Sequence, residues 1–271
     1  MVRLTNSSGV DYQTLCNPGM RSYVKSKSKS KTGAIMHQSP DQNGRIVGGV
    51  DEAGRGAVIG PMVVAGISFR ERDIQVLEEI GVRDSKLLSR KERAAKYGRL
   101  VEIARSICVR VVQIEEIDNN VSFKRLNHLE ALSMAQVIDN INADTIFVDC
   151  CDVNQEKFRS IILSHVKRRL QNARSGKMEV FSFHHADSLN LAVSAASIVA
   201  KVIREEEIGN IRKIHREIGS GYPSDKQTAR FIKSWIDVTG VPPPFARSSW
   251  LPVKKLLWER QQTKMMLGQQ P

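Results

Sequence analysis

Two apolar runs separated by a glycine-containing turn stand out early in the chain. Residues 46–50 are short and partly β-branched, and residues 62–69 form a longer apolar run. Runs of this length and composition are typical of β-strands. The segment between them contains Gly54, Gly56 and Gly60, which favour a tight turn. The pattern therefore predicts two strands that form a hairpin.

Strand and helix patterns then alternate along the chain. Apolar residues recur at a spacing of three from Leu126 to Ile138, which places them on one face of a helix. The other predicted elements are a polar helix at residues 91–103, strands at 107–114, 145–149 and 178–183, and helices at 158–166 and 194–209. Their order predicts an α/β fold, in which the sheet opens with a hairpin and continues through crossover helices.

The first 45 residues lack this periodicity. Residues 25–31 alternate lysine with serine, a composition that cannot bury enough apolar surface to fold. Seven basic and two acidic residues give this segment +5 of the net charge of +12, which leaves +7 for residues 46–271. We expect a disordered basic tail, which is either a solvated extension or a segment that binds polyanions through non-specific electrostatics.

Composition narrows the class of protein. A chain of 271 residues, 41% of them hydrophobic, can bury a core in one or two domains. The net charge of +12 and the pI near 9.7 favour a polyanionic partner, with nucleic acid the leading candidate. No apolar stretch is long enough to span a membrane. Four cysteines without C-x-x-C spacing predict free thiols in a reducing cytoplasm rather than disulfides or a structural zinc site.

Acidic residues follow three of the predicted strands. Asp51 and Glu52 come after residues 46–50, Asp149 ends the run at 145–149, and Asp187 lies shortly after Phe183. Because the carboxyl ends of parallel strands gather at one edge of a sheet, these acids can converge in one cleft. A lone acid at a strand end is usually a cap or a surface residue, but acids after three strands of one basic chain favour a metal site. Its oxygen ligands suit two Mg²⁺ or Mn²⁺ ions about 4 Å apart, which would position a water and stabilise charge on a phosphate.

Six separate blocks, in their order along residues 46–250, resemble the ribonuclease HII family, the type 2 ribonucleases H. The blocks are residues 51–56, Asp84-Ser85-Lys86, Asp149, Ala186-Asp187, residues 194–201 and residues 219–225, of which the last is similar to the archaeal branch. The resemblance implies a ribonuclease H-like mixed sheet with flanking helices. It also implies an enzyme that cuts RNA in RNA/DNA hybrids and incises DNA 5′ to embedded ribonucleotides, leaving 5′-phosphate and 3′-hydroxyl ends.

The resemblance implies roles for individual residues as well. The family's four metal-binding acids fall on Asp51, Glu52, Asp149 and Asp187, the set already found from the strand ends. The turn Gly54-Arg55-Gly56 is similar to the family's ribonucleotide reader, whose backbone contacts the 2′-hydroxyl group.

Further implied contacts lie along the nucleic acid. Tyr222 resembles the tyrosine that packs on the deoxyribose following the ribonucleotide. Contacts to phosphates, which position a duplex, are implied for Lys86, Ser194, Ser197 and Lys201.

Two departures from the family pattern affect these expectations. Many members have Lys-x-Lys-Ala-Asp before the last acid, where this chain has Phe183-His184-His185-Ala186-Asp187, so a permanent positive charge is replaced by a group that titrates near neutrality. The two histidines are poor candidates for a transition-metal site, since neighbours on a strand point to opposite faces. Ala57 replaces a frequent proline after the Gly-Arg-Gly turn, which we expect to loosen that turn.

We expect three parts: the tail (1–45), a catalytic domain (46–215) and a C-terminal region (216–271), which the resemblance implies is a small helical subdomain that binds substrate. Residues 261–267 bear some similarity to a sliding-clamp peptide but lack its aromatic pair, and we expect a monomer. Two alternatives stay open: a non-catalytic nucleic-acid-binding module on the same fold, and a hybrid-only nuclease similar to ribonuclease HIII. Retention of the four acids argues against the first, and the Gly-Arg-Gly turn with Tyr222 argues against the second.

Overall fold

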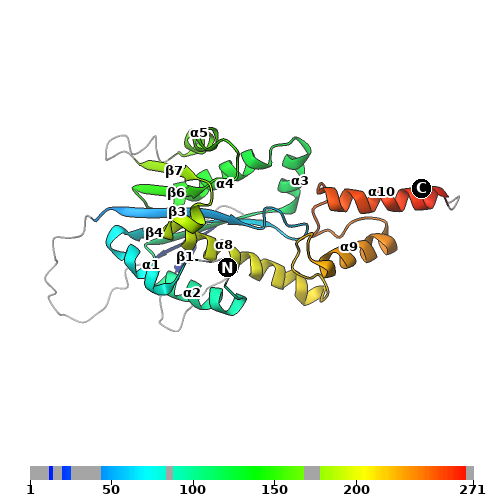
Figure 1. The fold of residues 1–271 in the computed structure, drawn as a ribbon, viewed down its shortest axis with the longest axis horizontal. Helices are drawn as coiled ribbons and strands as arrows, with labels where there is room; N and C mark the ends of the chain where they lie inside the picture. Colours follow the sequence, from blue (N-terminus) through cyan, green and yellow to red (C-terminus); the bar gives the residue numbers. More distant parts are fainter. Residues whose placement is uncertain (1–11, 15–19, 26–43, 84–87, 168–177, 267–271) are drawn as a thin grey trace.

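The chain folds around a mixed sheet (Figure 1). The computed structural model describes residues 12–14, 20–25, 44–83, 88–167 and 178–266. Within these residues the sheet has seven strands in the order β1-β2-β5-β4-β3-β6-β7. Their bounds are β1 (Tyr12–Thr14), β2 (Met20–Lys25), β3 (Ile46–Ala53), β4 (Met62–Arg70), β5 (Ser106–Val112), β6 (Thr145–Asp149) and β7 (Glu179–Phe183). β3 pairs antiparallel with β4 and parallel with β6, which is parallel to β7, so the predicted hairpin and mixed sheet are confirmed.

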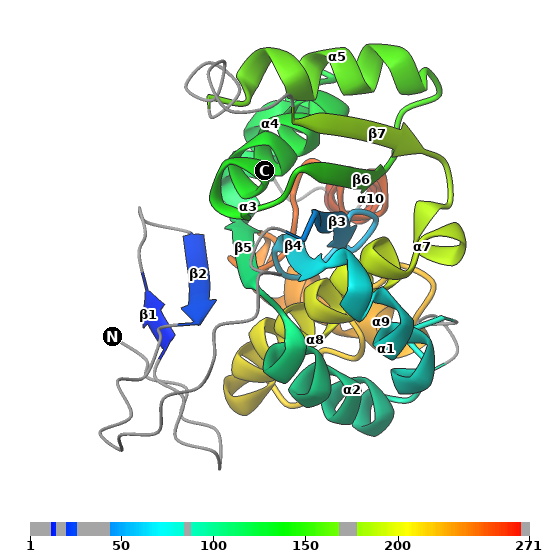
Figure 2. The same cartoon turned by 90° about the vertical axis from the view of Figure 1, so that its left-hand side faces the viewer.

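Helices cover both faces of this sheet (Figures 1 and 2). One face packs against α4 (Leu126–Asn140) and α5 (Gln155–His165), and the other packs against α2 (Arg90–Ile103) and α8 (Leu191–Ile214). Successive residues of a strand point to opposite faces, so Val64 of β4 lies in the α4 core while Val63 and Ala65 lie in the α8 core. Burial on both faces explains why residues 62–69 read as one continuous apolar run.

Helix α8 is the longest helix that the structure describes and lies directly against β3. Its first residues are capped by Asn190, whose side chain accepts hydrogen bonds from the N–H groups of Ala192 and Val193. The approach is so close that a Cβ atom on Gly49 would lie 2.1 Å from the backbone of Ala192. Glycine at position 49 thus allows α8 to pack against the acid-bearing strand. The helix extends beyond the predicted residues 194–209 at both ends.

The far end of α8 carries a separate helical region. This region contains α9 (Lys226–Thr239) and α10 (Leu251–Met266), and its apolar core includes Ile208 of α8 and Ile232 of α9. Val58 and Ile59, from the turn that follows β3, belong to the same core. The C-terminal helices therefore hold the loop that leaves the acid-bearing strand, and the boundary at residues 215 and 216 stays a prediction.

Several elements differ from the sequence-based expectation. The predicted strand at residues 107–114 ends at Val112, and α3 (Ile114–Ser122) begins at Ile114 because Glu115 and Glu116 favour the first turn of a helix. Two short helices, α1 (Ile74–Ile80) and α7 (Ala186–Leu189), were not predicted.

The tail also differs in part from the disordered segment that was expected. β1 and β2 form a hairpin, and β2 pairs antiparallel with β5, for example Ser22 with Cys108. Without β2, β5 would be an edge strand with unpaired N–H and C=O groups. Pairing with β2 gives β5 a second hydrogen-bonded neighbour. The expectation of disorder is therefore wrong for Tyr12–Thr14 and Met20–Lys25.

The described residues bear on two exclusions made from the sequence, that of disulfides and that of a membrane span. Cys108, Cys150 and Cys151 are free thiols there, while Cys16 lies outside these residues. None of the helices in this part of the chain is both long and apolar enough to cross a membrane.

Candidate active site

Three of the predicted acids meet at one edge of the sheet. Val50 of β3 is paired with Val148 of β6, so the next residues, Asp51 and Asp149, lie side by side. Ligand oxygens of Asp51, Glu52 and Asp149 all lie within 4.8 Å of one another. Asp51 and Glu52 are still part of β3, because their pairing with β4 continues after pairing with β6 has ended. The acids thus lie just beyond the last parallel pair, although Asp51 and Glu52 are still inside the strand.

The two neighbouring acids of β3 reach the cluster from opposite faces of the sheet. Asp51 is hydrogen-bonded by Ser197 of α8. Glu52 lies near Glu130 of α4, which is fully buried. Alternation along a strand separates these side chains, and the end of the parallel pairing lets them converge beside Asp149.

Burial makes this cluster electrostatically unfavourable without a cation. It raises the pKa of Asp51 well above its ordinary value, and the charges of Glu52 and Asp149 add to this effect. Burial, together with the charges of Glu130 and Asp149, raises the pKa of Glu52 to about 8. Oε2 of Glu52 is buried without a hydrogen-bond partner among the described residues. An unsatisfied carboxylate oxygen among other acids fits a hard divalent metal ion.

Asp187 lies next to this cluster but is not one of the three. It is buried in α7, and its carbonyl oxygen accepts a hydrogen bond from the hydroxyl of Ser194. The preceding residue, Ala186, donates its N–H to Oδ1 of Asp149 at 2.6 Å. This bond ties the start of α7 to β6. Asp187, the fourth predicted acid, is therefore the residue next to one that contacts the cluster.

The Gly-Arg-Gly turn leaves the cluster two residues after Glu52. Gly54 has φ of 83°, a conformation that favours glycine. The Arg55 side chain is held against α4, because its Nε donates to Glu130 at 2.8 Å and its Nη2 donates to Asn127 at 2.5 Å. Gly56 is exposed, and a Cβ atom there would meet nothing within 4 Å.

A buried arginine from the C-terminal region fixes the carbonyl groups of this turn. Arg247 is fully buried and donates to the carbonyl oxygens of Gly54 at 2.7 Å, Arg55 at 2.8 Å and Gly60 at 3.0 Å. Burial, together with the nearby positive charge of Arg204, lowers the pKa of Arg247 to about 9. Among the described residues, the N–H groups of Arg55 and Gly56 make no such backbone hydrogen bond. The turn thus directs its acceptors inward and keeps two donors for a ligand.

Tyr222 lies in a loop that is bonded to the same turn. The carbonyl oxygen of Gly221 accepts hydrogen bonds from Val58 at 2.8 Å and Ile59 at 3.1 Å. Asp225 caps α9 and accepts from the backbone of Ser220, and these hydrogen bonds lower the pKa of Asp225 to about 2. The loop is therefore fixed at both ends, and Tyr222 remains half-buried.

The predicted phosphate contacts have mixed positions. Ser194 and Ser197 are buried in α8, where the Ser194 hydroxyl already bonds main-chain carbonyls. Lys201 is half-buried on the same helix, and Lys86 lies outside the described residues. Buried hydroxyls that support Asp51 and α7 fit a supporting role better than a phosphate contact, while the roles themselves stay predictions.

The two histidines before Asp187 were placed on a strand, which is wrong. β7 ends at Phe183, and His185 caps α7 with φ of 55°. Nδ1 of His184 lies 3.3 Å from the carbonyl oxygen of Cys150. Both histidines therefore occupy the turn between β7 and α7, where strand alternation does not apply.

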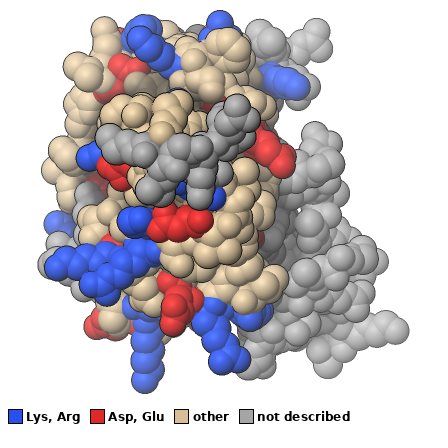
Figure 3. Space-filling model, turned by 90° about the vertical axis from the view of Figure 1, so that its right-hand side faces the viewer, with Lys and Arg blue, Asp and Glu red and all other residues tan. Residues whose placement is uncertain are grey.

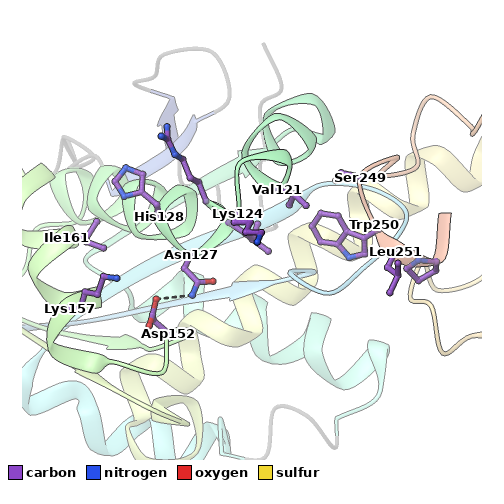
Figure 4. A pocket seen from close by; sticks show the side chains of 13 residues that line it. Val121, Lys124, Asn127, His128, Asp152, Lys157, Ile161, Ser249, Trp250 and Leu251 are labelled. Atoms are coloured by element: carbon purple, nitrogen blue, oxygen red, sulfur yellow. Dashed lines mark hydrogen bonds between the residues drawn. The ribbon is translucent and has the colours of Figure 1, made fainter. Parts of the chain in front are cut away.

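An open cleft of about 670 Å³ is lined by residues of α3, α4, α5 and α10, among them Asn127 (Figure 4). Asn127, which binds Arg55, also donates to Asp152 at 2.8 Å across this cleft. The basic residues of its lining are Lys124, Arg125, His128 and Lys157. These basic groups lie at the start of α4 and on α5, and they suit an anionic backbone.

Four residues of this arrangement were missed by the sequence analysis: Asn127, Glu130, Arg204 and Arg247. Glu130 could have been noticed as an acid within the buried stripe of α4. Arg204 and Arg247 gave no such sign, because each donates to main-chain carbonyl groups that are more than 140 residues away along the chain.

Comparisons with known proteins agree with this geometry. The family model for Ribonuclease HII matches residues 48–253. A ribonuclease HII of Cenarchaeum symbiosum is 42% identical over 209 residues, which cover 77% of this chain and 97% of that protein. The ribonuclease H2 structure from Pyrococcus horikoshii OT3 has a TM-score of 0.72 at 35% identity and covers 80% of this chain and 99% of its own. The ribonuclease HII of Archaeoglobus fulgidus, solved in a complex with PCNA, has a TM-score of 0.68 at 34% identity over 78% of this chain and 96% of its own.

Proposed function

The chain belongs to the ribonuclease HII family and is a type 2 ribonuclease H that cleaves RNA in RNA/DNA hybrids, and from this membership we propose that it also incises DNA 5′ to single embedded ribonucleotides, leaving 5′-phosphate and 3′-hydroxyl ends. The observation that carries the proposal is one continuous bonded unit. The acid cluster leads into the Gly-Arg-Gly turn, and the Tyr222 loop is bonded to that turn through Gly221.

The four acids supply the metal-binding part of this unit. Asp51, Glu52 and Asp149 would hold divalent ions together with Asp187, and the unsatisfied Glu52 oxygen supports that assignment. Two bound Mg²⁺ or Mn²⁺ ions would supply an activated water and stabilise the charge that develops on the phosphate. Ser197 holds Asp51, and Ala186 holds Asp149, so both carboxylates are oriented before any ion binds.

Recognition of the sugar falls to the turn and to the tyrosine. The N–H groups of Arg55 and Gly56 would donate to the ribose 2′-hydroxyl, the group that separates RNA from DNA. Tyr222 would pack on the following sugar, where a 2′-hydroxyl would collide with the ring. An enzyme with both contacts prefers a ribonucleotide that is followed by a deoxyribonucleotide.

Duplex binding would use the basic surfaces outside the cluster. Lys124 and Lys157 of the cleft that Asn127 lines would meet phosphates (Figure 4). The end of the molecule formed by α9 and α10 carries basic groups with acids between them (Figure 3). Some of these basic groups are already paired, as Lys233 is with Asp237 at 2.8 Å.

The test is cleavage of two duplexes with and without Mg²⁺. One is a DNA duplex with a single ribonucleotide, and the other is a continuous RNA/DNA hybrid. We expect Mg²⁺-dependent cutting of both, and ligation of the downstream product would establish its 5′-phosphate. Cleavage of the hybrid alone would refute incision at single ribonucleotides and favour the hybrid-only alternative. Activity that persists in a chelator would refute the metal site.

Tyr222→Ala tests the sugar contact separately. We expect this variant to lose more activity on the single-ribonucleotide duplex than on the hybrid, because only the first places a deoxyribose against the ring. Gln227→Ala is a matched control, since Gln227 is an exposed residue of the following helix. Equal losses on both duplexes in Tyr222→Ala would mean that the ring is only an anchor of its loop.

A sliding-clamp contact is a second proposal, supported by the complex of the Archaeoglobus fulgidus ribonuclease HII with PCNA. The segment concerned, residues 261–267, forms the end of α10 as far as Met266, and Leu267 lies outside the described residues. Deletion from residue 261 onward should abolish co-elution with an archaeal clamp and leave cleavage of free duplex unchanged. Retained co-elution would place the contact elsewhere.

A further inference from the structure

A second buried arginine lies between the two elements that we assign to sugar recognition. Arg204 of α8 is 5% exposed, and its guanidinium carbon lies 4.5 Å from the centre of the Tyr222 ring. On its other side the same side chain touches the Gly-Arg-Gly turn, since a Cβ atom on Gly54 would lie 2.2 Å from its Nε. One side chain therefore packs against both Gly54 and Tyr222.

No ion pair offsets the burial of this charge, because the acid that favours it, the neighbouring Glu205, is paired with Arg90 and Arg93. Among the ion pairs between described residues, none includes Arg204, and its Nε is buried without a hydrogen-bond partner. Its one hydrogen bond to a described residue is long, 3.4 Å from Nη2 to the carbonyl oxygen of Ile59. Burying a cation without an anionic partner is costly. Hence an ion pair does not account for an arginine at this position.

The contacts that Arg204 does make are those of a spacer between the Gly-Arg-Gly turn and the Tyr222 ring. A guanidinium over an aromatic ring is attracted by the ring and stacks flat on it. The Gly221 carbonyl is already bonded to Val58 and Ile59, so Arg204 fills the remaining space between the turn and the ring. Loss of its planar group would let the ring tilt although the loop stays bonded.

Its position on α8 also relates the ring to the acids. Ser197, which bonds Asp51, and Arg204 are seven residues apart, so they share one face of the helix. Seven residues span about 10 Å along a helix. A single rigid element thus sets the distance between the acid cluster and the tyrosine.

We propose that Arg204 is a positioning residue that holds the Tyr222 ring at a fixed distance from Gly54 and thereby sets the preference for a ribonucleotide followed by a deoxyribonucleotide. The inference rests on the proposed function of the turn and of Tyr222. It goes beyond that function because Arg204 itself touches no substrate in this role. A purely structural arginine would affect stability and both substrates alike.

The experiment measures kcat/KM on the single-ribonucleotide duplex and on the RNA/DNA hybrid, and takes the ratio of the two. The variants are Arg204→Met, Arg204→Lys, Tyr222→Ala and the double variant Arg204→Met with Tyr222→Ala. Arg93→Met is the matched control, because Arg93 pairs with Glu205, the neighbour of Arg204 on α8, rather than with Tyr222. Thermal unfolding of each variant shows that it is folded.

We expect Arg204→Met to lower the ratio about fivefold to thirtyfold, the range between an exposed and a desolvated cation–π contact. Arg204→Lys keeps the charge but not the planar group, so it should lower the ratio by a smaller factor. It also provides the test if Arg204→Met does not fold. The double variant should have the ratio of Tyr222→Ala alone, because the two residues act on one contact. Arg93→Met should leave the ratio unchanged.

Two failures are distinguishable. If Tyr222→Ala lowers the ratio while neither variant of Arg204 does, the positioning role is wrong and the proposed function stands. If Tyr222→Ala itself leaves the ratio unchanged, the proposed role of Tyr222 is wrong, and the inference falls with it. Additive losses in the double variant would also overturn the inference, since they would mean that Arg204 acts independently of the ring.

Discussion

Replacing Glu52 by glutamine should stabilise the metal-free protein above neutral pH. The carboxyl group of Glu52 has a pKa of about 8 in the folded protein, against an ordinary value of 4.5. Between these two values the folded state keeps a proton that the unfolded chain releases. The contribution of Glu52 to stability is therefore present below pH 4.5 and is lost as pH rises through 8. The Glu52→Gln variant would lack this dependence, because an amide does not titrate in this range.

The magnitude follows from the distance between the two pKa values. At 1.36 kcal/mol for each tenfold change in proton affinity, the full difference corresponds to an upper limit of about 5 kcal/mol. The Glu52 residue is half-buried, so water screens its charge and reduces this limit, and we expect about 1 to 2 kcal/mol at pH 8. For a chain of this length that is a rise in Tm of roughly 2 to 8 °C.

The assay is thermal unfolding of the parent and of Glu52→Gln at pH 5, 6.5 and 8, in chelator and in Mg²⁺. In chelator the advantage of Glu52→Gln should grow from pH 5 to pH 8. In Mg²⁺ it should shrink, because a cation that binds only the folded parent stabilises it. Glu79→Gln, which changes an exposed acid on α1, should match the parent under all conditions. Parallel curves of Tm against pH for the parent and Glu52→Gln in chelator would refute the reasoning.

Two further predictions concern the acids and the tail. Asp149→Asn should abolish Mg²⁺-dependent cleavage while the protein still folds and binds the duplex, because an amide oxygen is a poor substitute for a metal-binding carboxylate; turnover near the parent's in a single-turnover assay would contradict the metal site. Removal of residues 1–44 should leave the cut position unchanged, and it should flatten the slope of log affinity against log salt by about two to three units if the tail makes two or three phosphate contacts. Equal slopes for both proteins in binding titrations would mean that the tail does not touch the duplex.

The acid cluster was predictable because it depends on regular pairing. Residues 62–69 read as a continuous apolar run because β4 is buried on both faces, and this burial identified a central strand. Parallel pairing of β3 with β6 then brings Asp51 and Asp149 to the same edge of the sheet, independently of contacts elsewhere in the chain. A local pattern and one rule of sheet topology are sufficient for three of the acids.

The supports of the turn were not predictable, because they depend on contacts between distant segments. Arg247 bonds the carbonyl oxygen of Gly54 across 193 residues. A main-chain carbonyl has the same chemistry at every position, so nothing in the sequence around Gly54 indicates which side chain will bind it. The short helix α7 was missed for a related reason, since four residues carry too little periodicity to be recognised.

Ala57 shows how these distant supports change the meaning of a local departure. Alanine in place of the frequent proline was expected to loosen the turn. The N–H of Ala57 instead donates to the carbonyl oxygen of Gly54 at 3.2 Å, a bond that proline could not make. Arg247 binds the same carbonyl oxygen, and Arg204 packs against the same glycine. The rigidity that a proline ring would supply from within the turn is therefore supplied here from outside it, by two arginines that reach it from α8 and from the C-terminal region.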